Sequence, residues 1–99
     1  MAEFLTVDPR TLHLPPSLWA GADLIKLTRQ FSKFGLSIAG IPAPWVHRDG
    51  GGRLKIVDGV TRATRVAKYL PGVLIQVEVT ADQPTADYST YPTIGDTIP

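Results

Sequence analysis

The sequence RLKIVDGVTRATRVAKYLPGVLIQVEV, residues 53–79, predicts a strand, a turn, a helix and a second strand in succession. Residues 54–57 have the alternation of a strand, and Asp58-Gly59 favours a sharp change of direction because glycine tolerates positive φ. Pro71 and Gly72 end the helix, and residues 73–79 alternate again as a second strand. This unit brings a glycine turn and the start of a helix to one place.

The expected helix in this unit has two stripes. Its N-cap is either the Thr61 hydroxyl or the competing Asp58 carboxylate. One stripe is apolar, has i, i+3, i+4, i+7 spacing and is expected to face a core: Ala63, Val66, Ala67 and Leu70. The other is basic, has i, i+3, i+6 spacing and is expected to be exposed: Arg62, Arg65 and Lys68.

The start of this helix is a candidate anion site. Unpaired N–H groups and the positive end of the helix dipole attract anions to a helix N-terminus. Gly59 gives backbone access to a phosphate, and Thr61 offers a hydroxyl and an N–H group. Arg62 and Arg65 supply a charge clamp. The same pattern also fits a plain turn followed by a solvated basic face.

Residues 57–79, VDGVTRATRVAKYLPGVLIQVEV, resemble the signature of the ParB/sulfiredoxin-like superfamily. In that pattern a strand ends in a Gly-x-x-Arg turn, a short helix follows, and then a valine-rich strand. Residues 23–59 are similar to the family's order of helix, proline-bearing strand, glycine hairpin and strand. The likeness covers residues 5–79, and its most specific part is residues 58–62. It implies a small α+β domain with a mixed sheet of about four short strands and two main helices.

The chain departs from each activity that the resemblance offers. Sulfiredoxins carry a reactive cysteine where this chain has Val60, and the chain has no cysteine. ParB proteins bind a cytidine nucleotide through Gly-Glu-Arg-Arg, of which Gly59 and Arg62 match, and the DNA-binding helices that follow have no counterpart here. Serine kinases of the superfamily share the Asp-Gly-x-Thr-Arg turn but place histidine at Val60, and their catalytic glutamate has no evident match. No compact carboxylate–lysine cluster supports a nuclease.

Composition predicts one globular domain of 99 residues, with 43% hydrophobic and 19% charged residues. All ten Lys and Arg lie in residues 1–79 with six acids, and residues 80–99 hold three acids and no base. This mild basic excess suits a phosphate ligand and falls short of a dedicated DNA binder. No apolar run reaches the ~18 residues of a membrane span and no signal peptide opens the chain, so we expect a cytoplasmic protein without membrane contact.

The first half of the chain supports the main unit. Residues 3–7 predict a strand, and Trp19 is expected to anchor the irregular loop at residues 10–21 on the core. Residues 22–34 predict a helix with basic residues on its solvated side. The expected core-facing residues of this helix are Leu24, Leu27, Phe31 and Phe34, with Ile25 widening the stripe; the basic ones are Lys26, Arg29 and Lys33.

Three further segments complete the expected architecture. Residues 35–41 form a connection, and residues 42–48 predict a strand that its two prolines place at an edge or make irregular. Residues 49–52 are expected to turn this strand back onto the next as a hairpin. The boundary of the domain is set at residue 79, and residues 80–99 are expected to be a Thr/Pro-rich extended tail, packed or partly mobile, which Tyr88 and Tyr91 tie down.

Catalytic and metal-binding residues are scarce. His13 and His47 have no metal-site spacing and are expected at the surface or an edge. Asp58 is the weak catalytic candidate, as a base or as a holder of a metal–phosphate complex, and capping the helix is its structural alternative.

The expected function is binding of a phosphate-bearing ligand, a nucleotide, with Mg²⁺ as a possible companion. A second hypothesis is an enzyme: a nucleotide hydrolase, a phosphotransferase or a nuclease. A third is an interaction module or toxin-like fragment of a larger protein that acts through a protein partner or as a dimer. Nucleic acid is a further candidate ligand.

Overall fold

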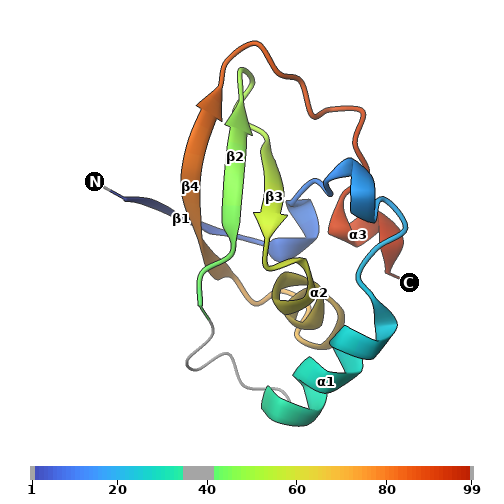
Figure 1. Ribbon diagram of the computed structural model, residues 1–99. Helices are drawn as coiled ribbons and strands as arrows, with labels where there is room; N and C mark the ends of the chain where they lie inside the picture. Colours follow the sequence, from blue (N-terminus) through green and yellow to red (C-terminus); the bar gives the residue numbers. More distant parts are fainter. Residues whose placement is uncertain (1, 35–41, 99) are drawn as a thin grey trace.

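The protein is a small α+β domain with a four-stranded mixed sheet, as the sequence predicts (Figure 1). The computed structural model describes residues 2–34 and 42–98. The order of the strands across the sheet is β1-β4-β2-β3, with β2 and β4 parallel and the other pairs antiparallel. In chain order the strands and α-helices are β1 (Glu3–Val7), α1 (Leu24–Phe34), β2 (Trp45–Asp49), β3 (Leu54–Asp58), α2 (Val60–Tyr69), β4 (Ile75–Gln83) and α3 (Ile94–Thr97).

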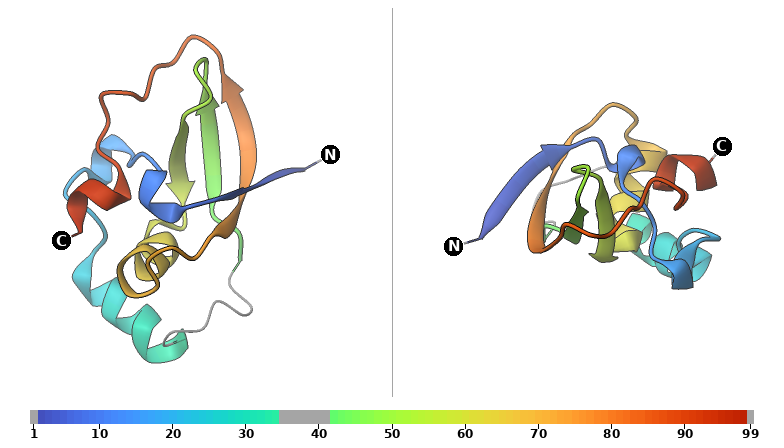
Figure 2. Two further views of the ribbon diagram at one scale, coloured as in Figure 1. Left: turned by 180° about the vertical axis from the view of Figure 1, so that it is seen from behind. Right: turned by 90° about the horizontal axis from the view of Figure 1, so that it is seen from above.

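The helices lie on one side of the sheet, and the core is between the two layers (Figure 2). Two 3₁₀ turns, η1 (Pro9–Thr11) and η2 (Pro16–Leu18), lie in the segment that connects β1 to α1. The core cluster combines fully buried apolar side chains from the sheet, from α2 and from the other segments of the chain. They include Val46, Ile56 and Val77 from the sheet, Ala63 and Ala67 from α2, and Leu12, Leu14 and Ile94 from elsewhere.

The hairpin between β2 and β3 confirms the expected turn at residues 49–52. The expectation of an edge position for the proline-bearing strand is wrong, because β2 lies between β4 and β3. Pro42 and Pro44 precede the first ladder residue, Trp45, so their missing N–H groups remove no bond from the strand. The strand is irregular, with register shifts on either side of Val46.

Helix α2 begins at Val60, two residues earlier than a Thr61 cap requires. Its N-cap is Gly59, with φ 95°, and no described side chain makes a capping hydrogen bond. The expected Thr61 or Asp58 cap is therefore wrong. The left-handed conformation of Gly59 lets the chain leave β3 and enter α2 with no other residue between them.

Helix α1 shows a larger departure from the sequence pattern. Asp23 caps it, with the carboxylate Oδ1 accepting from Ile25 N at 2.8 Å and from Lys26 N at 3.1 Å. Of the described side chains in the expected core-facing stripe, Leu27 is 4% exposed whereas Leu24 is 72% exposed. The reason is that α1 packs mainly against α2, so only a narrow strip of it is covered. The expected connection at residues 35–41 and the Phe34 side chain lie outside what the structure describes.

The segment after residue 79 belongs to the same domain. Strand β4 runs through the expected boundary to Gln83, so residue 79 is no break. Tyr88 is 2% exposed, and Tyr91 stacks edge-on against Trp19, which confirms that these tyrosines tie the segment down. Ile94 is fully buried in the core. Trp19 is expected to anchor its loop on the core, but its Nε1 donates to the Leu14 carbonyl oxygen of the same loop at 3.1 Å, and its side chain is 46% exposed and lies outside the core cluster.

Candidate functional site

A cavity of about 290 Å³ opens where β3 ends and α2 begins. Its wall comes mainly from the turn and the first residues of α2, and it is completed by η2 and α1. The lining residues are Leu18, Lys26 and residues 57–62. Four of the five predicted site residues therefore line one cavity: Asp58, Gly59, Thr61 and Arg62.

Gly59 shapes the cavity in two ways. As an N-cap without a side chain it leaves the first N–H groups of α2 uncapped by any described side chain, although its own carbonyl accepts from Ala63 N at 3.0 Å. A Cβ at this position would lie 2.7 Å from Arg62 Nη2 and 2.9 Å from Pro44 Cβ. Backbone donors and the positive end of the α2 dipole thus face a space that no other residue type would leave open.

Arg62 is the cation nearest to these donors. Its guanidinium lies across Gly59, and Nη2 donates to Asp58 Oδ2 at 3.2 Å. The Arg62 side chain is 23% exposed, and its Nε is buried without a hydrogen-bond partner among the residues that the structure describes. The buried Nε is out of reach of an entering anion, and the exposed part of the guanidinium is the part that remains available to one.

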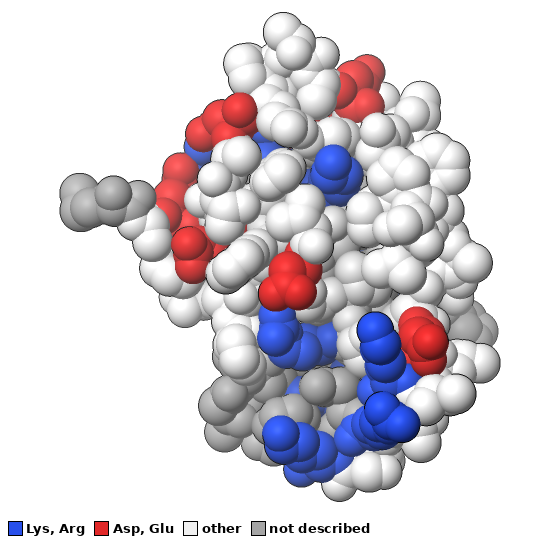
Figure 3. All heavy atoms as spheres, in the orientation of Figure 1, with Lys and Arg blue, Asp and Glu red and all other residues white. Residues whose placement is uncertain are grey.

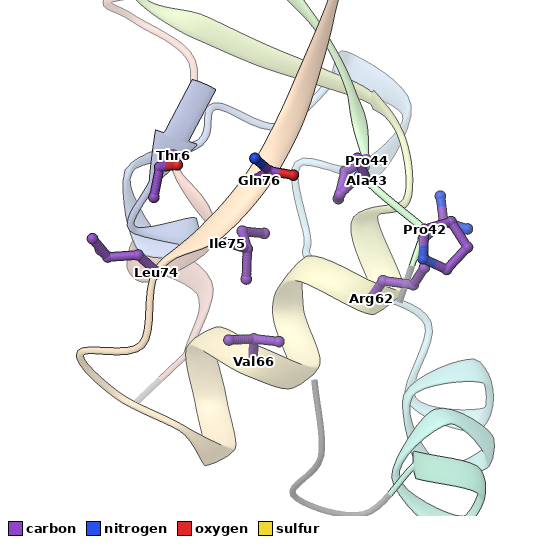
Figure 4. A pocket seen from close by; sticks show the side chains of 9 residues that line it. All are labelled: Thr6, Pro42, Ala43, Pro44, Arg62, Val66, Leu74, Ile75 and Gln76. Carbon is purple, nitrogen blue, oxygen red and sulfur yellow. The ribbon is translucent and has the colours of Figure 1, made fainter. Parts of the chain in front are cut away.

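Arg62 also borders a second cavity of about 320 Å³, formed by the start of β4, the end of β1, residues 42–44 and α2. Figure 4 shows Arg62 at one end of this cavity and Leu74 at the other, with Val66 and Ile75 between them. Gln76 and Thr6 are its other polar side chains. One arginine thus connects a polar cavity with a more apolar one.

Asp58 pairs with Arg62 instead of capping the helix. Its side chain is 61% exposed and lies within the cavity that holds Gly59. Its negative charge competes with any anion for Arg62, so a bound phosphate has to displace it or neutralise it through a cation. In the described part of the chain, no group of three or more His, Asp or Glu side chains is placed to hold a metal ion.

Arg65 does not belong to the site, and the predicted exposed basic stripe on α2 is wrong at this position. Arg65 is fully buried, and burial lowers the pKa of its guanidinium. Helix α2 is covered by the sheet on one side and by α1, η1 and α3 on others, so its buried surface is wider than the apolar stripe. Leu70, expected in the core, is the half-buried C-cap of the helix. Arg62 and Arg65 therefore do not form a common clamp.

Lys26 is the site residue that the sequence did not indicate. It comes from α1, far from the glycine turn in the chain, and its pattern fits an ordinary solvated helix face. Only the packing of α1 against α2 brings it into the cavity wall. Figure 3 shows Lys and Arg side chains gathered over this part of the molecule.

The two histidines lie away from the cavity. His13 Nδ1 lies 2.9 Å from the Tyr91 carbonyl oxygen, which gives His13 a structural partner. His47 is half-buried on β2, a central strand, so its expected surface or edge position is wrong. The prolines before His47 are a local signal for an edge, and they lie outside the ladder itself.

The resemblance to the ParB/sulfiredoxin-like superfamily remains a hypothesis. The four-stranded mixed sheet with two longer helices agrees with the fold that the resemblance implies. None of the helices in the described ranges is long and apolar enough to cross a bilayer. Comparisons with protein-family models, with curated proteins and with solved structures found no match.

Proposed function

We propose that this domain binds a phosphate-bearing ligand, a nucleotide, in the Gly59 cavity. The observation that carries the proposal is the uncapped start of α2 beside Arg62, in a cavity that Lys26 also lines. Backbone N–H groups, a guanidinium and an ammonium are the donors that phosphate oxygens accept from. The ParB/sulfiredoxin-like resemblance supports the same ligand through its Gly-x-x-Arg turn.

In this proposal the Asp58 carboxylate is a candidate ligand for Mg²⁺. A carboxylate beside a phosphate is repelled unless a cation lies between them. Mg²⁺ is commonly bound by one or two carboxylates together with substrate phosphates. In this proposal Asp58 either leaves Arg62 when phosphate arrives or holds the Mg²⁺ of a nucleotide complex. The cytoplasm, where nucleotides and Mg²⁺ occur together, is the proposed location.

The test is calorimetric titration of the protein with the four ribonucleoside triphosphates and with pyrophosphate, each with and without Mg²⁺. Arg62→Ala should weaken binding by roughly 1.5–3 kcal/mol, the range for a charge-assisted hydrogen bond. Its effect on unfolding should be small, because the ion pair with Asp58 is partly exposed. Arg10→Ala is the matched control, since it removes a basic residue that does not line the cavity.

Three outcomes of these titrations can be distinguished. Ligand binding that Arg62→Ala reduces and Arg10→Ala does not would support the site. Arg62→Ala binding as tightly as the parent would place the ligand elsewhere. Absence of binding to every phosphate compound tested would reject the proposal.

A further inference from the structure

The charges of the chain are divided between two parts of the fold. Helices α1 and α2 contain six of the ten Lys and Arg and none of the nine Asp and Glu. The remaining residues hold all nine acids with only four bases. Figure 3 shows the result on one face, where blue side chains gather over the helices and most red ones lie toward the sheet. The net charge of +1 therefore conceals a local basic surface, to which the fully buried Arg65 does not contribute.

On α2 Lys68 is exposed, and on α1 the exposed cations form a line. Lys26, Arg29 and Lys33 are all exposed and follow i, i+3, i+7 spacing, which puts them along one side of the helix. At a rise of about 1.5 Å per residue, Arg29 lies about 4.5 Å and Lys33 about 10.5 Å beyond Lys26 along the helix axis. We name these three residues the α1 stripe.

The α1 stripe begins at the Gly59 cavity, because Lys26 lines that cavity together with Arg62. A mononucleotide held in the cavity would reach Lys26 but leave the rest of the stripe unused. The cavity is proposed for one phosphate and continues into a row of cations. A ligand that matches both in charge is a chain of regularly spaced phosphates. An acidic peptide would match the charge of the stripe. Its carboxylates are planar, however, and the cavity is proposed to bind a tetrahedral phosphate.

We propose that the domain binds the phosphorylated end of a single-stranded nucleic acid. The terminal phosphate occupies the Gly59 cavity, and the phosphodiesters that follow lie along the α1 stripe. The volume of about 290 Å³ has room for a terminal phosphate, and the duplex in the experiment below tests whether a strand end is required. This inference rests on the proposed function and names the class of ligand.

The experiment measures fluorescence anisotropy of labelled single strands of about 12 nucleotides, within the range of known single-strand sites. Strands of DNA and RNA carry a 5′-phosphate, a 3′-phosphate or neither, and one duplex is included. Affinity is measured against salt concentration. With Arg62 and the α1 stripe neutralising four phosphates, the slope of log K against log salt should be about −3, at roughly −0.7 per phosphate.

Two double variants distinguish the contribution of the α1 stripe to binding from the contribution of net charge. Arg29→Gln/Lys33→Gln should reduce the slope to about −1.4, because two of the four contacts are lost. It should leave the affinity for a mononucleotide unchanged, since neither residue lines the cavity. Arg10→Gln/Lys55→Gln removes the same charge elsewhere and should leave the oligonucleotide slope unchanged. All four are surface or part-exposed positions, and circular dichroism verifies that both variants fold.

The results distinguish this inference from the proposed function. If mononucleotides bind through Arg62 but oligonucleotides bind no more tightly, or if the two double variants behave alike, the inference is overturned and the nucleotide site stands. Equal affinity with and without a terminal phosphate, or preference for the duplex, also overturns it. If Arg62→Ala changes neither mononucleotide nor oligonucleotide binding, the proposed function itself fails.

Discussion

Gly59 is the residue on which both the fold and the proposed site depend. Its φ of 95° is in the region that favours glycine, and a Cβ would press on Arg62 and Pro44. Two separate features therefore require glycine at this position: the backbone conformation and the lack of space for a Cβ. They can be measured separately because Gly72 also has positive φ, 87°, but a Cβ added there would meet nothing within 4 Å.

Gly59→Ala should destabilise the protein by more than the ~1 kcal/mol typical of simple glycine effects. Gly72→Ala should cost less, since it carries the conformational strain without the crowding. Urea melts of the two variants provide the comparison, and the nucleotide titration of folded Gly59→Ala should show lost binding. Equal losses of stability in the two variants would show that the Arg62 and Pro44 side chains move away from the added Cβ at little energetic cost.

Asp49 is a second residue with an unusual environment. Its side chain is buried, Oδ1 accepts from Gly51 N and Arg53 N, and Oδ2 accepts from Tyr88 N. Burial raises the pKa of the carboxyl, but the hydrogen bonds from Tyr88, Arg53 and Gly51 outweigh it and lower the pKa from 3.8 to about 2. Asp49 therefore connects the β2–β3 turn to the segment that follows β4.

The lowered pKa of Asp49 predicts a pH dependence of stability. A carboxyl whose folded pKa is below its unfolded pKa contributes stability above the unfolded value and loses it as pH falls through the folded value. That contribution should be present above about pH 4 and disappear toward pH 2. Asp49→Asn should be less stable at neutral pH and show a shallower decline between these pH values. Chemical denaturation across the range is the measurement, and an unchanged slope would contradict the assignment.

At the scale of single elements, α2 shows how burial differs from the sequence pattern. Arg65 is among the largest fully buried side chains, and Leu70 at the end of the same helix is only half-buried. The expected stripe is buried at Ala63, Val66 and Ala67, so the helix is not rotated; its buried surface is wider than the stripe and includes Arg65. Lys68, on the same helix, is exposed.

Arg65→Ala should therefore cost ~2–5 kcal/mol of stability, the range for removing a large buried side chain. Lys68→Ala should cost under about 0.5 kcal/mol, as is usual for a surface position. Leu70→Ala should lie between the two. Urea melts of the three variants give the order, and a loss at Arg65 no larger than that at Lys68 would mean that Arg65 is exposed in solution.

At the scale of the whole molecule, the last residues complete the core. Ile94 is fully buried against Leu12 and α2 residues, and a capping box between Thr93 and Asp96 fixes the start of α3. Leu12 also accepts a hydrogen bond from Ile94 N at 2.9 Å. The chain therefore closes on its own beginning, and the segment after β4 is part of the folding unit.

Ile94→Ala should lower the free energy of unfolding by ~2–5 kcal/mol, as for other large-to-small changes in a core. Thr85→Ala, an exposed position between β4 and α3, is the control and should have little effect. Thermal and urea unfolding would show both. Wild-type stability of Ile94→Ala would restore the view that residues 80–99 are a peripheral tail.

The sequence by itself determined the segments whose signals are local. Side-chain periodicity and turn residues indicate β1, the β2–β3 hairpin, α2 and the α+β class, because these signals depend on neighbours within a few residues. Gly59, Thr61 and Arg62 are predicted together for the same reason, since they share one turn. The capping residue is not predicted, because a glycine N-cap leaves no side-chain signature.

Tertiary structure decided which faces are covered. Arg65 is buried and Leu24 exposed because α2 is covered by the sheet, α1, η1 and α3, while α1 packs mainly against α2. Neither fact is contained in the local pattern. Lys26 joins the Gly59 cavity, and Ile94 joins the core, through contacts between segments far apart in the chain. Burial is a property of long-range packing, so the sequence supplies the side chains and only the assembled layers determine where each one lies.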